Sequence, residues 1–168
     1  MVGRLSRALR NQLRAEKYSL DESEGGVHRM PVYYRYDFNI IKIYMAGEYS
    51  INDLRTTLLN SLADPERLPS SFLLFNIVES QSIYSRSTEE IQTMVDFIAS
   101  MAHQYNYRLA IVSSHDLPFI LQRFVSVKSK IYGIDAEVFR SDDEAREWLM
   151  SKPLYTYPHT NAVQKTKA

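Results

Sequence analysis

Ser113, Ser114, His115 and Asp116 follow one another in the chain, and they carry the side chains used in acyl transfer. In that chemistry serine is the nucleophile, histidine the base, and aspartate orients the histidine. Side chains of adjacent residues diverge, however, so Asp116 is poorly placed to orient His115. The sequence also has no Gly-x-Ser-x-Gly elbow to present a nucleophile. We therefore interpret this segment as a loop, and a hydrolase that uses serine and His115 is the third of our functional hypotheses.

Other catalytic and cofactor-binding patterns are missing from the sequence. The four histidines, which are His28, His103, His115 and His159, have neither i, i+4 pairing nor acidic neighbours at the spacing of metal ligands. The five glycines form no Gly-x-Gly phosphate loop, and there is no cysteine for thiol catalysis or thiolate ligands. We expect no metal site, no cofactor and no enzymatic activity.

Composition limits the partners and the cellular location of this 168-residue chain. Lys plus Arg and Asp plus Glu number 20 each, so no overall basic field attracts nucleic acid. No stretch approaches the roughly 20 apolar residues of a transmembrane segment. The lack of cysteine excludes a disulfide scaffold and is consistent with a cytoplasmic protein, which is the location that we expect.

The two ends of the chain differ in character from its middle. Residues 1–17 are basic, with Leu5, Leu9 and Leu13 on one helical stripe, and an acidic, glycine-containing linker follows. The segment after Pro153 has no periodic pattern, and we expect it to be mobile. We predict a basic arm and linker at 1–29, one domain at 30–151 and a tail at 152–168.

The middle of the chain begins its most distinct pattern at residue 72. Residues 72–78 are almost all apolar, which indicates a strand buried on both faces. Ser87 and Glu90 form a capping box before a helical repeat that we extend from Thr88 to about Tyr105. A second apolar strand follows at 108–113. Together these segments predict a βαβ crossover.

The segments on either side of this crossover extend the sheet. Strands at 32–37 and 40–45 are separated by so short a turn that they must be antiparallel. A helix capped by Ser50 or Asn52 and ending near Asp64 follows them, with an apolar face that consists of Leu54, Leu58, Leu59 and Leu62.

The third helix starts near Pro118 and is followed by a short strand and a last helix. We expect Phe119, Ile120, Phe124 and Val127 on its buried face, and Gly133 at its carboxyl end. A strand at 136–139 and a helix capped by Ser141 and Glu144 complete the order, and the last helix buries Ala145, Trp148 and Leu149. The predicted fold is α/β: a mixed sheet of about five strands, the first antiparallel, flanked by about four helices.

Apolar residues on the third helix exceed what packing on one sheet requires. Leu117, Phe119, Ile120, Leu121, Phe124, Val125 and Val127 occupy more than one face. An exposed remainder would bind a partner, a second subunit or an apolar ligand, and Arg123, Lys128 and Lys130 would flank it.

Several strings, in this order, resemble the STAS family, and more closely its SpoIIAA-like, or STAS/SEC14-like, branch of small bacterial proteins. They are Ile43-Tyr44-Met45-Ala46-Gly47-Glu48-Tyr49, Leu73-Leu74-Phe75-Asn76-Ile77, Arg108-Leu109-Ala110-Ile111-Val112 and Val138-Phe139-Arg140-Ser141-Asp142-Asp143-Glu144-Ala145-Arg146-Glu147-Trp148-Leu149. The resemblance covers about residues 32–150. It implies a STAS-like mixed sheet and a regulatory or binding role without catalysis.

The resemblance also points to a phosphorylation site. In phosphorylatable members an Asp on the central strand is followed by an Asp-Ser-Ser-Gly motif. When the family pattern is aligned with this sequence without gaps, its strand Asp falls on Asn76 and its motif falls on Tyr84-Ser85-Arg86-Ser87. The position of the usual phosphate-accepting serine then falls on Arg86. With a shift of that register, Ser85 or Ser87 would be the phosphoacceptor, although helix capping already accounts for Ser87.

Our leading hypothesis is a STAS-like interaction module that binds a protein partner or a second copy of itself. We expect the interaction surface to contain Glu79, Tyr84, Arg86, Phe119, Arg123 and Phe124. The alternative is a carrier or sensor of a lipid or another small apolar ligand, which the surplus apolar residues and the SEC14-like side of the resemblance suggest.

Overall fold

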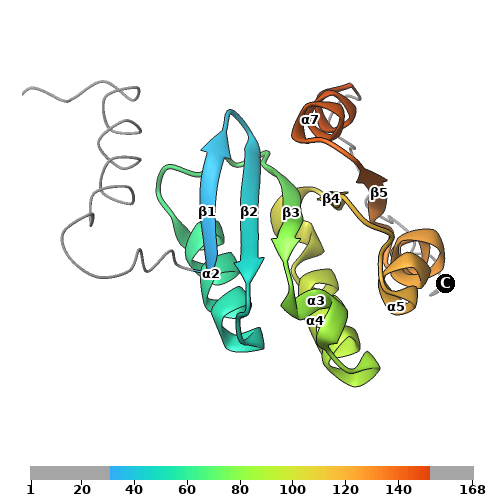
Figure 1. Ribbon diagram of the computed structural model, residues 1–168. Coiled ribbons are helices and arrows are strands. Elements are labelled where there is room, and N and C mark those ends of the chain that lie inside the picture. Colours follow the sequence, from blue (N-terminus) through green and yellow to red (C-terminus); the bar gives the residue numbers. More distant parts are fainter. Residues whose placement is uncertain (1–30, 152–168) are drawn as a thin grey trace, which may run out of the picture. The chain divides into compact units, whose positions relative to one another are not determined.

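A five-stranded sheet forms the centre of the computed structural model, which describes residues 31–151. The strands are β1 (Val32–Asp37), β2 (Ile40–Gly47), β3 (Phe72–Ser80), β4 (Arg108–Val112) and β5 (Asp135–Phe139), and they lie side by side in chain order (Figure 1). β1 is antiparallel to β2, and the other neighbours are parallel. The predicted mixed α/β sheet with an antiparallel first strand is confirmed. The predicted arm and tail lie outside the described residues.

The helices connect these strands in the predicted order. They are α2 (Ile51–Ala63), α3 (Ser82–Ser85), α4 (Thr88–Ser100), the 3₁₀ helix η1 (Ala102–Tyr105), α5 (Phe119–Arg123), the π-helix η2 (Phe124–Lys128), α6 (Ser129–Ile131) and α7 (Asp142–Met150). The helix expected at 88–105 is therefore α4 followed by η1. The short α3 was not predicted, and α5, η2 and α6 follow one another without a break where one α-helix was expected.

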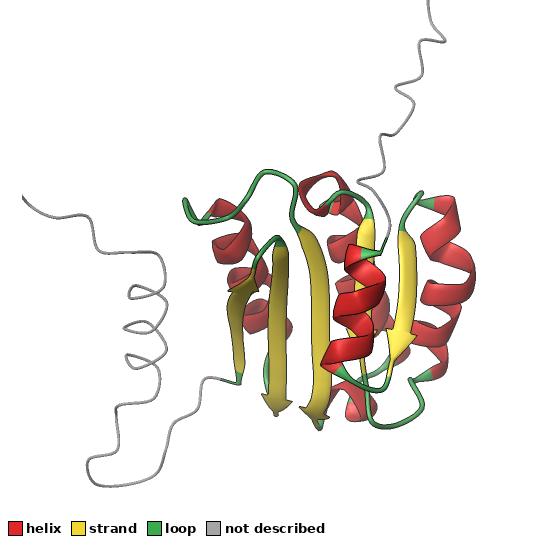
Figure 2. Cartoon of the chain, turned by 90° about the horizontal axis from the view of Figure 1, so that it is seen from above, coloured by secondary structure: helices red, strands yellow, loops and turns green. Residues whose placement is uncertain are grey.

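Most of the apolar core lies on one face of the sheet. The three crossovers, β2 to β3, β3 to β4 and β4 to β5, each move one strand further across the sheet in the same direction. Because crossovers between parallel strands are right-handed, their helices lie on the same side of the sheet. The core there joins Ile43, Phe75 and Ile111 of the sheet to residues of α2, α4 and α5, such as Leu58 and Met94. Figure 2 shows helices on both sides of the sheet.

The second face of the sheet has a smaller core, formed with α7. Leu74, Ala110 and Val112 pack there with Ala145 and Leu149, both of which are fully buried. The predicted inward position of these two α7 residues is confirmed. Trp148 is only half-buried and lies beside Phe139, with the ring centroids 5.5 Å apart.

Side-chain caps fix where the helices begin. Ser50, and not Asn52, caps α2: its hydroxyl accepts from the Asp53 amide, and the Asp53 carboxylate accepts from the Ser50 amide. Ser87 and Glu90 form the predicted capping box of α4. Such reciprocal bonds satisfy amide groups that the first helical turn leaves without partners.

Some positions expected in the core are at the surface. Leu59 is 45% exposed, because it follows the buried Leu58 and is turned about 100° from it around α2. Phe119 and Val127 are 75% and 49% exposed, whereas Leu121 and Phe124 face the core. The face predicted for the third helix was therefore wrong in these two residues. Phe119 lies before η2 and is turned about 140° around the helix from the buried Phe124, whereas Val127 lies within η2, which changes the helical period.

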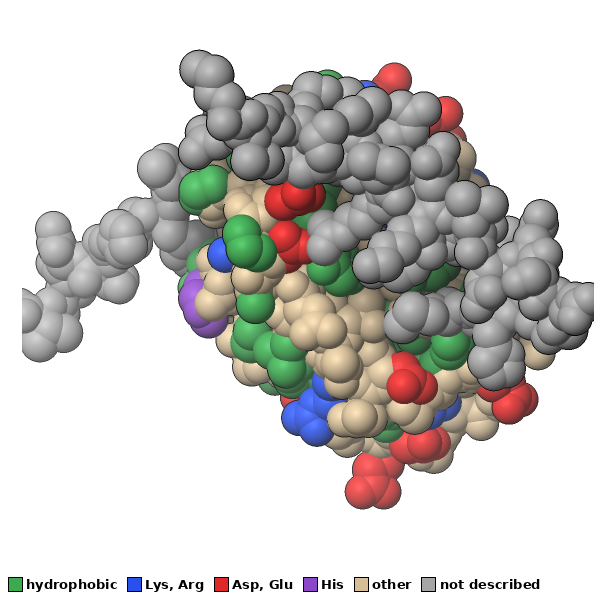
Figure 3. All heavy atoms as spheres, turned by 90° about the vertical axis from the view of Figure 1, so that its left-hand side faces the viewer, with side chains coloured by type: hydrophobic (Ala, Val, Ile, Leu, Met, Phe, Trp, Pro, Cys, Tyr) green, Lys and Arg blue, Asp and Glu red, His purple; other side chains and the backbone are tan. Residues whose placement is uncertain are grey.

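The face of the domain seen in Figure 3, which is the left-hand side of Figure 1, carries side chains of several kinds. Where the described residues are visible, acidic, basic and apolar side chains are all present. Within residues 31–151, no helix combines the length and the apolar character needed to cross a membrane.

Candidate interaction surface

Three loops meet at the carboxyl ends of the parallel strands. Residues 48–50 follow β2, residues 81–87 follow β3, and residues 113–118 follow β4. Carboxyl ends of neighbouring parallel strands lie at one edge of a sheet, which is where binding sites of open α/β sheets commonly form. Two of the predicted surface residues, Tyr84 and Arg86, lie in the middle loop of the three, and Glu79 lies near the end of β3, just before it.

Serine hydroxyls connect the first two loops. The Tyr49 amide donates to Ser82 Oγ over 3.0 Å, and Tyr49 Oη lies 2.9 Å from Ser80 Oγ. Ser82 Oγ also donates to the Gly47 carbonyl at 3.3 Å. Burial raises the pKa of the Tyr49 phenol, and its bonds to Ser80 and Arg86 partly oppose this shift. Tyr49 is therefore a structural anchor of this edge.

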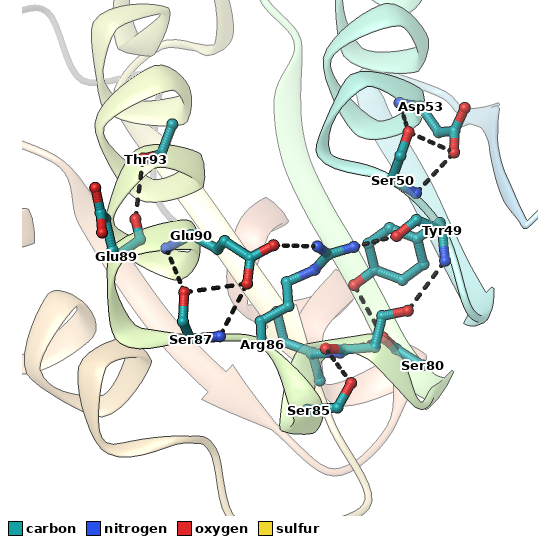
Figure 4. A network of polar contacts seen from close by, with 12 residues as sticks. Tyr49, Ser50, Asp53, Ser80, Ser85, Arg86, Ser87, Glu89, Glu90 and Thr93 are labelled. Carbon is teal, nitrogen blue, oxygen red and sulfur yellow. Dashed lines mark hydrogen bonds and ion pairs between the residues drawn. The ribbon is translucent and has the colours of Figure 1, made fainter.

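Arg86 holds the same two loops together from within (Figure 4). Its side chain is only 10% exposed, and its guanidinium lies 5.0 Å from the centre of the Tyr49 ring. Nη2 donates to the Tyr49 carbonyl, and Nη1 lies 3.3 Å from Glu90 Oε1. Arg86 therefore does not offer its charge to a partner, which corrects its predicted place on an interaction surface. Arg86 is buried because the loop of residues 81–87 directs its side chain toward Tyr49.

The two candidate phosphoacceptors differ in their bonding. Ser87 Oγ accepts from the Glu90 amide at 3.2 Å, and the Glu90 carboxylate accepts from the Ser87 amide at 3.0 Å. Mainly through that backbone bond, and also through the Ser87 hydroxyl, the pKa of Glu90 is lowered. Ser85 is exposed, and its hydroxyl donates to the Ser82 carbonyl within α3. Ser87 thus has a structural role, and phosphorylation of Ser85 or Ser87 stays a prediction.

Tyr84 connects the middle loop to the loop after β4. Its hydroxyl lies 3.0 Å from Ser113 Oγ, and its ring meets the His115 ring edge-on with centroids 6.1 Å apart. Ser113 is buried and also donates to the His115 carbonyl at 2.8 Å. Tyr84 is nevertheless 42% exposed, so it belongs both to the fold and to the outer surface.

The Ser-His-Asp segment does not form a triad in the described part of the chain. Ser114 Oγ lies 2.9 Å from His115 Nδ1, but Asp116 pairs with Arg140 at 3.0 Å. The Asp116 carboxylate is therefore directed at the guanidinium and not at the imidazole. Residues 31–151 also contain no group of three or more His, Asp or Glu side chains placed to hold a metal ion.

The residues predicted for the interaction surface divide by burial. Glu79, Tyr84, Phe119 and Arg123 are exposed, but Phe124 is only 2% exposed and belongs to the core. Phe124 is thereby corrected in the same way as Arg86. Phe119 and Phe124 are five residues apart, and the helix turns the first outward and the second inward.

One polar cluster was missed by sequence reasoning. On the second face of the sheet, Lys42 lies 3.1 Å from Asp37 and 3.5 Å from Asp142. Asn76 donates to Asp142 at 2.7 Å, and burial together with Asp142 raises the pKa of Tyr44 to about 12. Alternating polar residues on β2 were the only signal for it. Asn76, the position that matches the family's strand Asp, is therefore bonded to α7.

The chain can be compared with family models, with curated proteins and with solved structures. No family model matches the chain, and neither does any curated protein. A solved structure of an uncharacterized protein of the DUF3478 family from Shewanella loihica PV-4, described as having a SpoIIAA-like fold, is similar to it. The match has 17% identity and a TM-score of 0.47, and it covers 70% of this chain and 91% of the other.

Replacing Ser87 should weaken the fold in a pH-dependent way. We expect Ser87→Ala to lower the free energy of unfolding by about 1 kcal/mol, because α4 loses its cap. The pKa of Glu90 should rise only part of the way toward its ordinary value, because the amide of residue 87 still donates to the carboxylate, and an NMR titration measures this rise. The pKa of the Glu90 carboxyl is lower in the folded state than in the unfolded state, so the ionised carboxylate stabilises the fold when the pH is above the unfolded-state pKa. This stabilisation is lost as the pH falls through the folded-state pKa. The difference between wild type and variant should therefore shrink in acid.

Ser85→Ala is the matched control for this change. Its hydroxyl bonds only within α3, so the free energy of unfolding should change by no more than about 0.5 kcal/mol. Equal losses in the two variants would contradict the assigned cap, and an unchanged Glu90 titration in Ser87→Ala would contradict the contribution of the Ser87 hydroxyl to the pKa of Glu90.

The two arginines of the predicted surface should differ in their effect on stability. Arg86→Met leaves the Tyr49 carbonyl without its donor, so we expect the free energy of unfolding to fall by about 1–3 kcal/mol. Arg123→Met, at an exposed position, should change it by no more than about 0.5 kcal/mol. Urea denaturation of both variants measures this, and a stability loss confined to Arg123→Met would show that the burial is misassigned.

Proposed function

We propose that this protein is a non-enzymatic interaction module. Its partner-binding surface would lie at the carboxyl edge of the sheet and contain Glu79, Tyr84, Phe119 and Arg123. The observation that supports this most strongly is Phe119, which is 75% exposed next to the loop that Tyr84 contacts. A large apolar side chain that a folded domain leaves in water is typical of a contact with another molecule.

The bonding around this surface also supports recognition over catalysis. Tyr49, Arg86 and Ser87 use their polar groups within the fold, and these bonds hold the loops in one arrangement (Figure 4). A rigid surface loses little conformational freedom on binding, so more of the contact energy becomes affinity. The partner is another protein or a second copy of this chain.

Site-specific photo-crosslinking tests this proposal. A benzophenone amino acid replaces Phe119 in the full chain, and the same replacement at Phe38 is the control. Phe38 is the same residue type and is 73% exposed, but it lies in the β1–β2 turn at the opposite end of the sheet. In cells that produce the protein, we expect a discrete protein adduct from position 119 and none from position 38.

The other outcomes separate the alternatives. Equal adducts at both positions, or none at either, would contradict a partner-binding surface at Phe119. Adducts to lipid at position 119, identified by mass spectrometry, would replace the interaction module by the lipid-carrier hypothesis.

A further inference from the structure

The helical segment from Phe119 to Ile131 presents one exposed stripe along its outer side. The stripe consists of Phe119, Arg123, Val127 and Ile131, each four residues after the one before. Phe119, Val127 and Ile131 are 75%, 49% and 77% exposed, and Arg123 is exposed too. Exposed apolar groups that recur on one side of a helix provide a continuous contact line for a partner.

The π-helix η2 is what aligns the two ends of this stripe. In a regular α-helix, residues 12 positions apart point roughly 120° away from each other. A π turn takes up one extra residue, which reduces that angle to roughly 20°. The defining bond is present, since the Ser129 amide donates to the Phe124 carbonyl. Phe119 and Ile131 therefore face the same way only because of η2.

The inner side of the same segment is attached to the domain. Leu121 and Phe124 are buried in the main core, and buried Ser129 donates to the Val125 carbonyl at 2.7 Å. Lys128 Nζ donates to Gln92 of α4. The stripe is thus held in place before any partner arrives.

The helical segment itself carries charges of one sign. Residues 117–134 contain Arg123, Lys128 and Lys130 and no Asp or Glu. Lys128 is directed at Gln92, while Arg123 and Lys130 are exposed next to the apolar groups. A partner that places carboxylates beside an apolar ridge would match both features, and such complementarity speeds association and fixes register.

Two other occupants fit these features less well. A second copy packed on the stripe would add another Arg123 and Lys130 to the contact and no stripe carboxylate to pair with them, which is unfavourable. An anionic membrane would also meet Asp96 of neighbouring α4, whose carboxylate lies 3.4 Å from Tyr132 Oη. A single helix laid along the stripe covers less of the surface around Tyr132 than a membrane does.

We infer that the stripe formed by Phe119, Arg123, Val127 and Ile131 binds an amphipathic helix of a partner protein, with Asp or Glu flanking its apolar ridge. This inference rests on the proposed function and names the class of partner. It adds Val127, Ile131 and Lys130 to the binding surface.

Two matched peptides test the inference on the full 168-residue chain. Both are fluorescent helix-forming peptides of about 20 residues with Leu at i, i+4, i+7 and i+11; one carries Glu at the flanking positions and the other carries Lys. Fluorescence polarisation should show saturable binding of the Glu peptide and at least roughly tenfold weaker binding of the Lys peptide. Equal binding of both, or no binding of the Glu peptide, would overturn the inference.

Variants locate the binding on the stripe. Phe119→Ala and Ile131→Ala should each weaken binding of the Glu peptide roughly tenfold, as expected for anchoring side chains. Leu59→Ala, an exposed apolar residue on α2, is the matched control and should leave binding unchanged. The double variant Arg123→Glu and Lys130→Glu should reverse the preference to the Lys peptide, and this reversal cannot come from unfolding.

Vesicles of phosphatidylglycerol and phosphatidylcholine provide the other arm of the test. If the protein co-sediments with these vesicles, if Ile131→Ala abolishes this co-sedimentation, and if the Glu peptide does not bind, the stripe is a membrane-binding surface instead. If the Glu peptide does not bind while the benzophenone at position 119 still crosslinks to a protein, only the inferred class of partner is wrong. Failure of both experiments would remove the proposed function as well.

Discussion

The order of the strands is the constraint on which the rest of this structure depends. Because β2, β3, β4 and β5 follow one another across the sheet, their crossovers all advance in one direction. The helices of these crossovers therefore share one face, and the loops after β2, β3 and β4 lie in a row at one edge. α7 packs on the other face. The interaction surface that we propose lies at that row of loops and on the helical segment that follows the last of them.

Bonds inside the domain explain why this edge is suited to recognition. Arg86, Tyr49 and Ser80 give their polar groups to one another, and Tyr84 reaches the loop after β4 (Figure 4). Such bonds fix loops that would otherwise lose conformational entropy on binding. Phe119 is left at the surface by the same arrangement, because Leu121 and Phe124 supply the core contacts of its helix.

The parts of the fold that the sequence predicted are those with strong local signals. Residues 72–78 are apolar enough to define a buried strand, and the spacing of Ser87 and Glu90 defines the start of α4. α3 was missed because its four residues are too few to show a period. The π turn was missed because the apolar pattern of residues 119–131 resembles that of an α-helix, and its hydrogen bonds are set by packing.

The candidate site was only partly predictable, for a similar reason. Glu79, Tyr84 and Arg86 lie between a predicted strand and a predicted helix cap, but the direction in which each side chain points could not be predicted from the sequence. Arginine is seldom buried, so the inward position of Arg86 could not be expected from its residue type.

That residues 119–131 form a preformed docking surface is tested by ¹H–¹⁵N NMR spectra of the full chain during titration with the Glu-flanked peptide. We expect shift changes confined to residues 117–132 and the adjoining part of α4, with the Phe124 and Ser129 amides still protected from exchange. Shift changes centred on β1 and β2, or loss of that protection on binding, would contradict it.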